Sequence, residues 1–253
     1  MRVFSHALHP TPRPLLLASA AAFFAAFFVT RFPDVPGASV GSYASTVLIA
    51  LPSLVALFAH LGPRRAALSV LAVSAFAYAI ESVGVVTGFP YGAFFYDDAL
   101  GPRFLGLVPY LLPVTYVPLV IGAVAAVWTP GRLAPRIVLS ALLLVLIDAV
   151  LDPGATALGF WVWPEGGPYY GVPLSNFAGW LLSGAVSAAL LLSVGRTRTP
   201  PPPGALDSAI LALAFWTGAA VFSGLVLPAL LGPVLIVLSL ARRAALKTIS
   251  KSQ

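Results

Sequence analysis

Residues 142–180 read LLLVLIDAVLDPGATALGFWVWPEGGPYYGVPLSNFAGW and contain the features that decide the fold. Asp148 and Asp152 are four residues apart inside an apolar run, and Asn176 stands near the start of the next one. An ionisable group within a membrane helix costs roughly a few kcal/mol and usually marks function. The spacing puts both carboxylates on one helix face, where two charges would repel. One carboxyl is therefore expected to keep its proton unless a cation intervenes, as a general acid must.

The composition of the whole chain is that of a membrane protein. Hydrophobic residues make up 59% of it, charged residues only 9%, and the mean hydropathy is +0.96. Soluble domains contain about 25% charged residues. The runs are apolar on every face, whereas a transmembrane barrel needs alternating apolar and polar positions. The sequence therefore predicts an all-α, polytopic bundle of transmembrane helices.

The apolar runs predict about eight transmembrane helices, with seven as the alternative. Prolines and glycines between Gly224 and Pro233 leave the last two runs open between two helices and one kinked helix. We expect a cytoplasmic tail at 1–13, a single transmembrane domain at 14–241 and a basic cytoplasmic tail at 242–253. The expected spans are 14–30, 40–61, 66–86, 104–128, 136–160, 173–194, 206–224 and 225–240.

The distribution of basic residues predicts the orientation. With eight spans and a cytoplasmic amino terminus, only Arg31 and Arg103 of the 14 lysines and arginines lie outside. This is the bias that cytoplasmic loops show, so we expect a multi-pass protein of the inner membrane with both termini cytoplasmic. The remaining basic residues, all expected inside, are Arg2, Arg13, Arg64, Arg65, Arg132, Arg136, Arg196, Arg198, Arg242, Arg243, Lys247 and Lys251.

A third acid, Glu81, lies in another expected span. At about 1.5 Å per residue, Glu81, Asp148 and Asp152 reach a similar depth in the outer half of the membrane. Each acid has a structural alternative: Asp152 precedes Pro153 and could end the helix, and Glu81 could hold two helices together. The shared depth favours one site.

Aromatic residues gather in the two expected outer loops, 88–96 and 159–170. They are typical either of an interfacial belt or of a pocket whose ring faces stabilise a cation. Because the expected inner boundary has few aromatic residues, we favour a substrate-binding pocket. Its candidate residues are Tyr91, Tyr96, Trp161, Trp163, Tyr169, Tyr170 and Trp180.

Several classes of protein are excluded by residue type. The chain has no cysteine, which removes disulfides and thiolate metal sites. The lysines, Lys247 and Lys251, lie in the tail, so a span offers none for a retinal Schiff base. His60 is the single histidine outside the amino-terminal tail, too few for haem or a histidine-rich metal site. There is no glycine-rich phosphate loop, and we expect no metal, no cofactor and no nucleic acid.

Four segments together resemble a known family. They are ESVGVVTGFPYGAFFY at 81–96, DAVLDP at 148–153, WVW at 161–163 and YYGVPLSNFAGW at 169–180. This combination, which covers the third to sixth expected spans, resembles the membrane carotenoid biosynthesis family of bacteria and haloarchaea. The resemblance implies a carotenoid hydratase that adds water across the terminal 1',2' double bond of an acyclic (ψ) end group, as in γ-carotene or lycopene derivatives.

The chemistry of such a hydration suits these residues. A protonated carboxyl among Glu81, Asp148 and Asp152 would protonate the alkene, and a neighbouring carboxylate would accept the proton of the incoming water. Asn176 would orient that water. The carotenoid would enter from the lipid phase, among membrane lipids, and the water from the outer face.

Three other functions fit part of the pattern. A lycopene cyclase starts with the same protonation, so the residues separate it poorly from a hydratase. A membrane prenyltransferase would use the Asp-x-x-x-Asp pattern to hold Mg²⁺, but it needs a second aspartate-rich helix and basic residues at that face. A non-catalytic carotenoid carrier, or an assembly protein associated with other carotenoid enzymes, is the third alternative.

Overall fold

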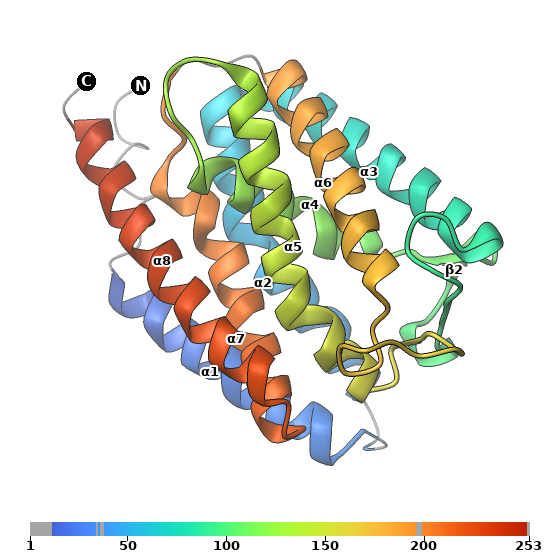
Figure 1. Ribbon diagram of the computed structural model, residues 1–253. Coiled ribbons are helices and arrows are strands. Elements are labelled where there is room, and N and C mark those ends of the chain that lie inside the picture. The colour runs from blue at the N-terminus through green and yellow to red at the C-terminus, as the bar shows by residue number, and fades with distance from the viewer. Residues whose placement is uncertain (1–11, 34, 36–37, 196–198, 252–253) are drawn as a thin grey trace.

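The computed structural model describes residues 12–33, 35, 38–195 and 199–251. Within these residues the chain forms eight α-helices joined by loops (Figure 1). The helices are α1 (Pro12–Arg31), α2 (Ala38–Leu61), α3 (Pro63–Thr87), α4 (Leu112–Ala126), α5 (Leu133–Ala157), α6 (Leu174–Gly195), α7 (Asp207–Phe222) and α8 (Val226–Lys251). Short elements complete the fold: strands β1 (Phe95–Tyr96), β2 (Arg103–Phe104), β3 (Val108–Pro109) and β4 (Trp161–Val162), and 3₁₀ turns η1 (Asp98–Leu100) and η2 (Pro203–Leu206).

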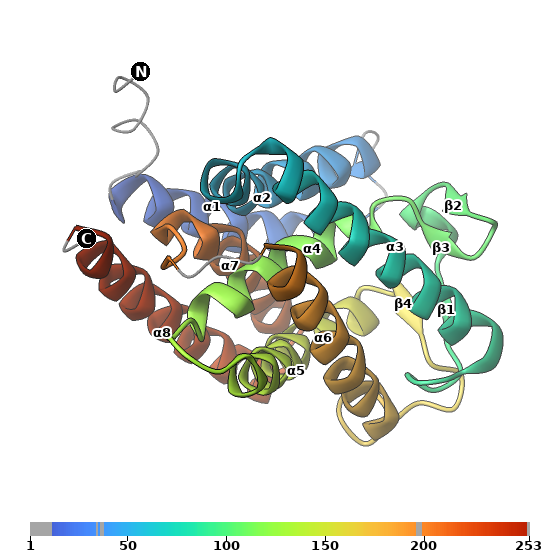
Figure 2. The same ribbon diagram turned by 90° about the horizontal axis from the view of Figure 1, so that it is seen from above.

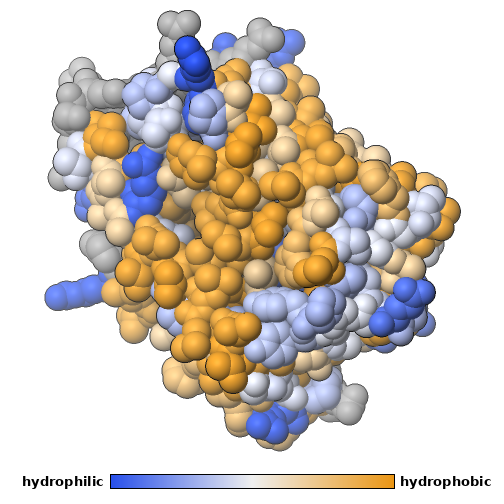
Figure 3. Space-filling model, viewed as in Figure 1, coloured by the Kyte–Doolittle hydropathy of each residue, from blue (hydrophilic) through white to orange (hydrophobic). Residues whose placement is uncertain are grey.

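The protein is a polytopic helical membrane protein, as its composition predicts. Seven of the described helices are long and apolar enough to cross a membrane. Large apolar side chains on their outward faces are exposed, and Figure 3 shows them as a broad apolar area over the face on which α5 and α8 lie. These side chains would contact lipid.

The shorter helix, α4, lies inside the bundle. Its 15 residues rise about 22 Å, less than the roughly 30 Å of a hydrocarbon core. Every residue from Tyr116 to Ala125 is buried, because α2, α3, α5, α6 and α7 all pack against this helix (Figure 2). A helix that is apolar on all sides is one that is enclosed by others.

The expected span at 104–128 is wrong at its start. Residues 103–109 form a small hairpin in which Arg103 pairs with Pro109 and Phe104 with Val108. The turn contains Gly106, with a φ of 73°, a backbone conformation that ends regular structure and favours glycine. The hairpin residues are as apolar as a helix, so hydropathy alone could not separate the two.

The end of the chain differs from the expected span at 225–240. Helices α7 and α8 are separate, because the chain turns at Gly224, with a φ of 74°. Helix α8 then continues to Lys251, through most of the segment expected as a tail. The eight helices alternate in direction, so α1 begins and α8 ends at the same end of the bundle (Figure 1).

At the other end of the bundle, two loops are joined by a short β-ribbon. Strand β1, in the loop after α3, pairs antiparallel with β4, in the loop after α5: Phe95 lies opposite Val162 and Tyr96 opposite Trp161. The ladder is extended by the amide of Asp97, which donates to the carbonyl of Phe160 at 2.9 Å. The ribbon thereby ties together the two loops that the sequence singles out.

Candidate active site

Helix α5 carries Asp148 and Asp152 one turn apart, and both side chains are buried. The helix does not end at Pro153 but continues to Ala157. Proline has no N–H to donate to the carbonyl four residues earlier, which here is that of Ala149. The hydroxyl of Tyr169 donates to this carbonyl at 3.0 Å instead. Asp152 is therefore not a helix-terminating residue, and Tyr169 supports the helix that presents it.

Asn176, in the first turn of α6, connects the two aspartates. Its Nδ2 donates to Oδ2 of Asp148 at 2.9 Å and to Oδ2 of Asp152 at 2.5 Å. The two carboxyl groups also lie close enough for their charges to interact. Because the amide uses one oxygen of each carboxyl, the second oxygens stay available for a shared proton.

Glu81 lies on α3 and is held from the β-ribbon. The hydroxyl of Tyr96 donates to its Oε2 at 2.8 Å. Burial raises the pKa of Tyr96 well above its usual value, so this hydroxyl stays protonated and serves as a donor. Tyr96 thus orients the carboxyl of Glu81.

Tyr91 is fixed between two helices at the same end of the bundle. A Cβ added at Gly84 of α3 would lie 2.9 Å from its ring, and one at Gly179 of α6 would clash with the ring outright. The indole nitrogen of Trp163 donates to the carbonyl of Tyr91 at 3.2 Å. The two glycines therefore allow α3 and α6 to pack closely against the ring of Tyr91.

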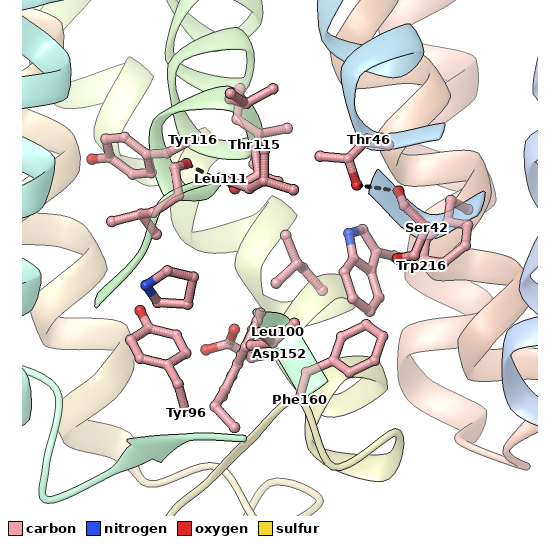
Figure 4. Close-up of a pocket in the computed structure, with 18 of the residues that line it drawn as sticks. Ser42, Thr46, Tyr96, Leu100, Leu111, Thr115, Tyr116, Asp152, Phe160 and Trp216 are labelled. Carbon is pink, nitrogen blue, oxygen red and sulfur yellow. Dashed lines mark hydrogen bonds between the residues drawn. The ribbon is translucent and has the colours of Figure 1, made fainter. Parts of the chain in front are cut away.

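One cavity brings most of the predicted site residues together (Figure 4). Glu81, Asp152 and Asn176 line it, and its volume of about 220 Å³ is much larger than the roughly 30 Å³ that a water molecule occupies. Asp148 lies behind this wall, with 0% of its surface exposed. Five of the predicted aromatic residues also line the cavity: Tyr91, Tyr96, Trp161, Trp163 and Trp180.

Tyr169 and Tyr170 do not line the cavity. The hydroxyl of Tyr169 bonds to α5, and that of Tyr170 accepts a hydrogen bond from the amide of Leu227 at 3.1 Å. Their hydroxyl groups thus hold the loop after α5 against neighbouring helices.

Other lining residues are not in the predicted set. Trp216 of α7 lies edge-on to Phe160, with ring centroids 6.2 Å apart, and both face the cavity (Figure 4). Tyr116 of α4 reaches it from the enclosed helix, and its hydroxyl is 2.9 Å from Oγ of Ser187. The available signal was the presence of aromatic residues within largely aliphatic spans, which by itself does not say which way a helix faces.

The cavity combines acids with apolar and aromatic walls. Among the described residues that line it, none is lysine, arginine or histidine. A search of the described residues finds no group of three His, Cys, Asp or Glu side chains arranged to hold a metal ion. Such a site can keep a carboxyl protonated, present it to an apolar ligand and surround a transient cation with ring faces.

Comparison with known proteins identifies the family. Residues 39–239 match the carotenoid biosynthesis protein family, so the chain belongs to it. A bisanhydrobacterioruberin hydratase of Haloarcula japonica is 41% identical over 188 residues, which cover 70% of this chain and 63% of the relative. The chain thus spans less than two thirds of the relative's length. No solved structure matches the chain.

Proposed function

We propose that the protein is a carotenoid 1',2'-hydratase that acts on an acyclic (ψ) end group, as in γ-carotene or lycopene derivatives. The observation that carries this proposal is the amide-bridged aspartate pair beside a cavity that is walled by aromatic rings and has no basic residue among its described lining. Family membership and the name of the 41% identical relative support the same reaction class.

In the first step Asp152 acts as the acid, since its side chain lines the cavity. Its proton goes to the less substituted carbon of the terminal double bond, whose π electrons form the new C–H bond. The other carbon becomes a tertiary cation. Asp148, buried behind Asp152 and joined to it through Asn176, keeps a proton of its own, so the pair shares the single negative charge that Asp152 acquires.

In the second step water captures the cation, and a C–O bond forms. Glu81, oriented by Tyr96, accepts the proton that the water loses, so the product is a tertiary alcohol. The proton returns from Glu81 to Asp152 through water in the cavity. The net reaction adds one water molecule to the alkene to give the alcohol, with no net oxidation or reduction.

The rings that line the cavity would stabilise the cation during its short life. Cation–π attraction is worth about 2 kcal/mol when the pair is shielded from water. Trp161 and Trp216 lie with ring centroids 6.5 Å apart on this wall. A wall without basic residues avoids repulsion of the same cation.

The orientation that fits this function places the acid end of the bundle at the outer face of the inner membrane. The carotenoid would then enter from lipid and the water from outside. A reporter fused after Gln253 should behave as cytoplasmic, and a reporter in the loop after α3 should not. The opposite pair of results would reverse the orientation.

The test is expression in a cell that accumulates lycopene or γ-carotene, with mass spectrometry of the pigments. The expected product is heavier by one water and carries a hydroxyl. A ring without a mass change would favour the lycopene cyclase alternative, and a pigment that gains an isoprenoid unit would favour a prenyltransferase. Unchanged pigment in cells with folded protein would favour a carrier or assembly protein.

A further inference from the structure

A second cavity lies at the end of the bundle opposite the carboxylates. It has a volume of about 850 Å³ and is formed where α2, α4 and α6 end and α5 begins. Arg136, at its wall, is 16 residues before Asp152 on α5, which corresponds to about 24 Å of helix. The two cavities therefore belong to different membrane levels.

Three nitrogen-bearing side chains on this wall have buried atoms without a partner. They are Nε of Arg136, Nε1 of Trp128 and Nε2 of His60. Arg136 is only 6% exposed, so its charge does not escape to water as that of a surface arginine would. Its buried Nε has no hydrogen-bond partner among the residues that the structure describes.

The other buried arginine at this end of the bundle shows what is missing. Nε of Arg243 lies 2.6 Å from Oδ1 of Asp207, and both side chains of this ion pair are buried. Among the described residues that line the second cavity, none is aspartate or glutamate. Arg136 is therefore a buried cation for which the described part of the cavity wall supplies no carboxylate as counter-charge.

An uncompensated buried charge is unfavourable, and an anionic ligand would remove that cost. We propose that this cavity binds a phosphate group, with Arg136 as the charged donor and Trp128 and His60 as further donors. Arginine presents a fork of N–H groups that matches phosphate oxygens. The position also fits, because pockets with basic residues between transmembrane helices at the cytoplasmic side bind anionic lipid head groups.

The remaining walls of the cavity are suited to the apolar part of a lipid. Leucine, isoleucine and valine side chains, including Leu57, Ile121 and Leu191, contribute to them together with prolines and small residues. A phosphate could nevertheless come from solution. A lipid and a free phosphate would make the same contacts through the phosphate group. Only the lipid would also gain binding energy from contacts with the apolar walls.

The experiment uses the full-length protein, delipidated in a neutral detergent. Phosphatidylglycerol, a diacylglycerol with the same acyl chains and inorganic phosphate are titrated separately, with native mass spectrometry and thermal stability as readouts. We expect phosphatidylglycerol to bind and stabilise the protein, and the diacylglycerol to do neither. Stabilisation by inorganic phosphate at similar concentration would support the site with a soluble source.

Matched variants test whether the phosphate group binds in this cavity. Arg136→Gln should weaken binding about ten- to a hundredfold, as expected for the loss of a hydrogen bond to a charged group. Arg132→Gln removes the same charge from an exposed position four residues earlier, outside the cavity lining, and should leave binding unchanged. Equal loss in both variants, or no loss in Arg136→Gln, would overturn the proposal.

A second variant guards against misfolding of Arg136→Gln. Trp128→Phe keeps a ring in place and removes its N–H donor, so binding should weaken several-fold while the melting temperature without ligand stays near that of the unchanged protein. Unaltered binding in this variant would contradict the role of Trp128. None of these readouts depends on hydratase activity, so the inference stands or fails apart from the proposed function.

Discussion

Asp152 and Asp207 are equally buried aspartates, each 2% exposed, yet their partners differ. Asp207 forms a two-point interaction with Arg243, at 2.6 and 3.2 Å. Asp152 has the neutral amide of Asn176 and a second aspartate beside it. An arginine supplies a counter-charge to a carboxylate, whereas an amide and a second acid supply none. Burial alone therefore does not identify a functional acid; the partner does.

The largest effect is expected at the amide-bridged pair. Asp152→Asn keeps the size and the acceptor oxygen but removes the transferable proton, so hydration should slow by about 10²–10⁴-fold. Asp148→Asn should have a comparable effect, because it removes the group that shares the charge of Asp152. The measurement is pigment hydrated per amount of folded protein. Rates near normal in both variants would exclude these residues as the acids and turn the search to the aromatic loops.

The same substitution at Asp207 should affect stability rather than chemistry. Asp207→Asn removes the carboxylate of the buried ion pair with Arg243, a loss that costs about 3–5 kcal/mol. The melting temperature in detergent should fall, while the rate per folded molecule stays unchanged. Combining Asp207→Asn with Arg243→Met should restore much of the stability, since the buried positive charge is then removed as well. A melting temperature that does not move would mean that the ion pair is not structural.

A smaller effect is expected at the hydroxyl that orients Glu81. Tyr96→Phe removes one hydrogen bond, worth about 0.5–1.5 kcal/mol, and should lower the rate about two- to tenfold. Tyr110→Phe is the control, because Tyr110 is exposed and outside the cavity lining. A loss of the same size in both variants would indicate a general effect on the loop.

The smallest expected effect comes from removal of metal ions. If bound protons, and not metal ions, reduce the repulsion between the carboxyl groups, protein treated with a chelator should retain its hydration rate. The check is a rate measurement before and after dialysis against EDTA, followed by Mg²⁺. A loss that Mg²⁺ alone reverses would make the aspartates metal ligands and revive the prenyltransferase alternative.

The fold was predictable wherever an apolar run filled a whole helix. The bounds of α2, α3 and α6 lie within three residues of the expected spans, because charged, proline or glycine residues flank these runs. The hairpin at 103–109 was not predictable from hydropathy, since it is apolar like the helix that follows. The carboxy-terminal end of α8 could not be placed either, because basic residues such as Arg242 and Lys247 are compatible with a helix at the membrane surface.

The site was predictable only in part for a similar reason. Spacing along one helix placed Asp148 and Asp152 on one face, and loop composition indicated Tyr91 and Tyr96. Which aspartate reaches the cavity depends on how α5 is rotated against its neighbours, which sequence spacing does not give. The contributions of Tyr116 and Trp216 depend on contacts between helices far apart in the chain.

The β-ribbon between the loops after α3 and α5 has a consequence for the choice among double bonds. Tyr96 and Trp161, paired within it, both line the cavity beside Asp152. A wall fixed by backbone hydrogen bonds cannot yield as a loose side chain would, so a long polyene cannot slide past it. In the proposed reaction, such a wall acts as a stop for the chain end. Regioselectivity for the terminal alkene would then follow from the length of chain admitted, without recognition of any polar group on the substrate.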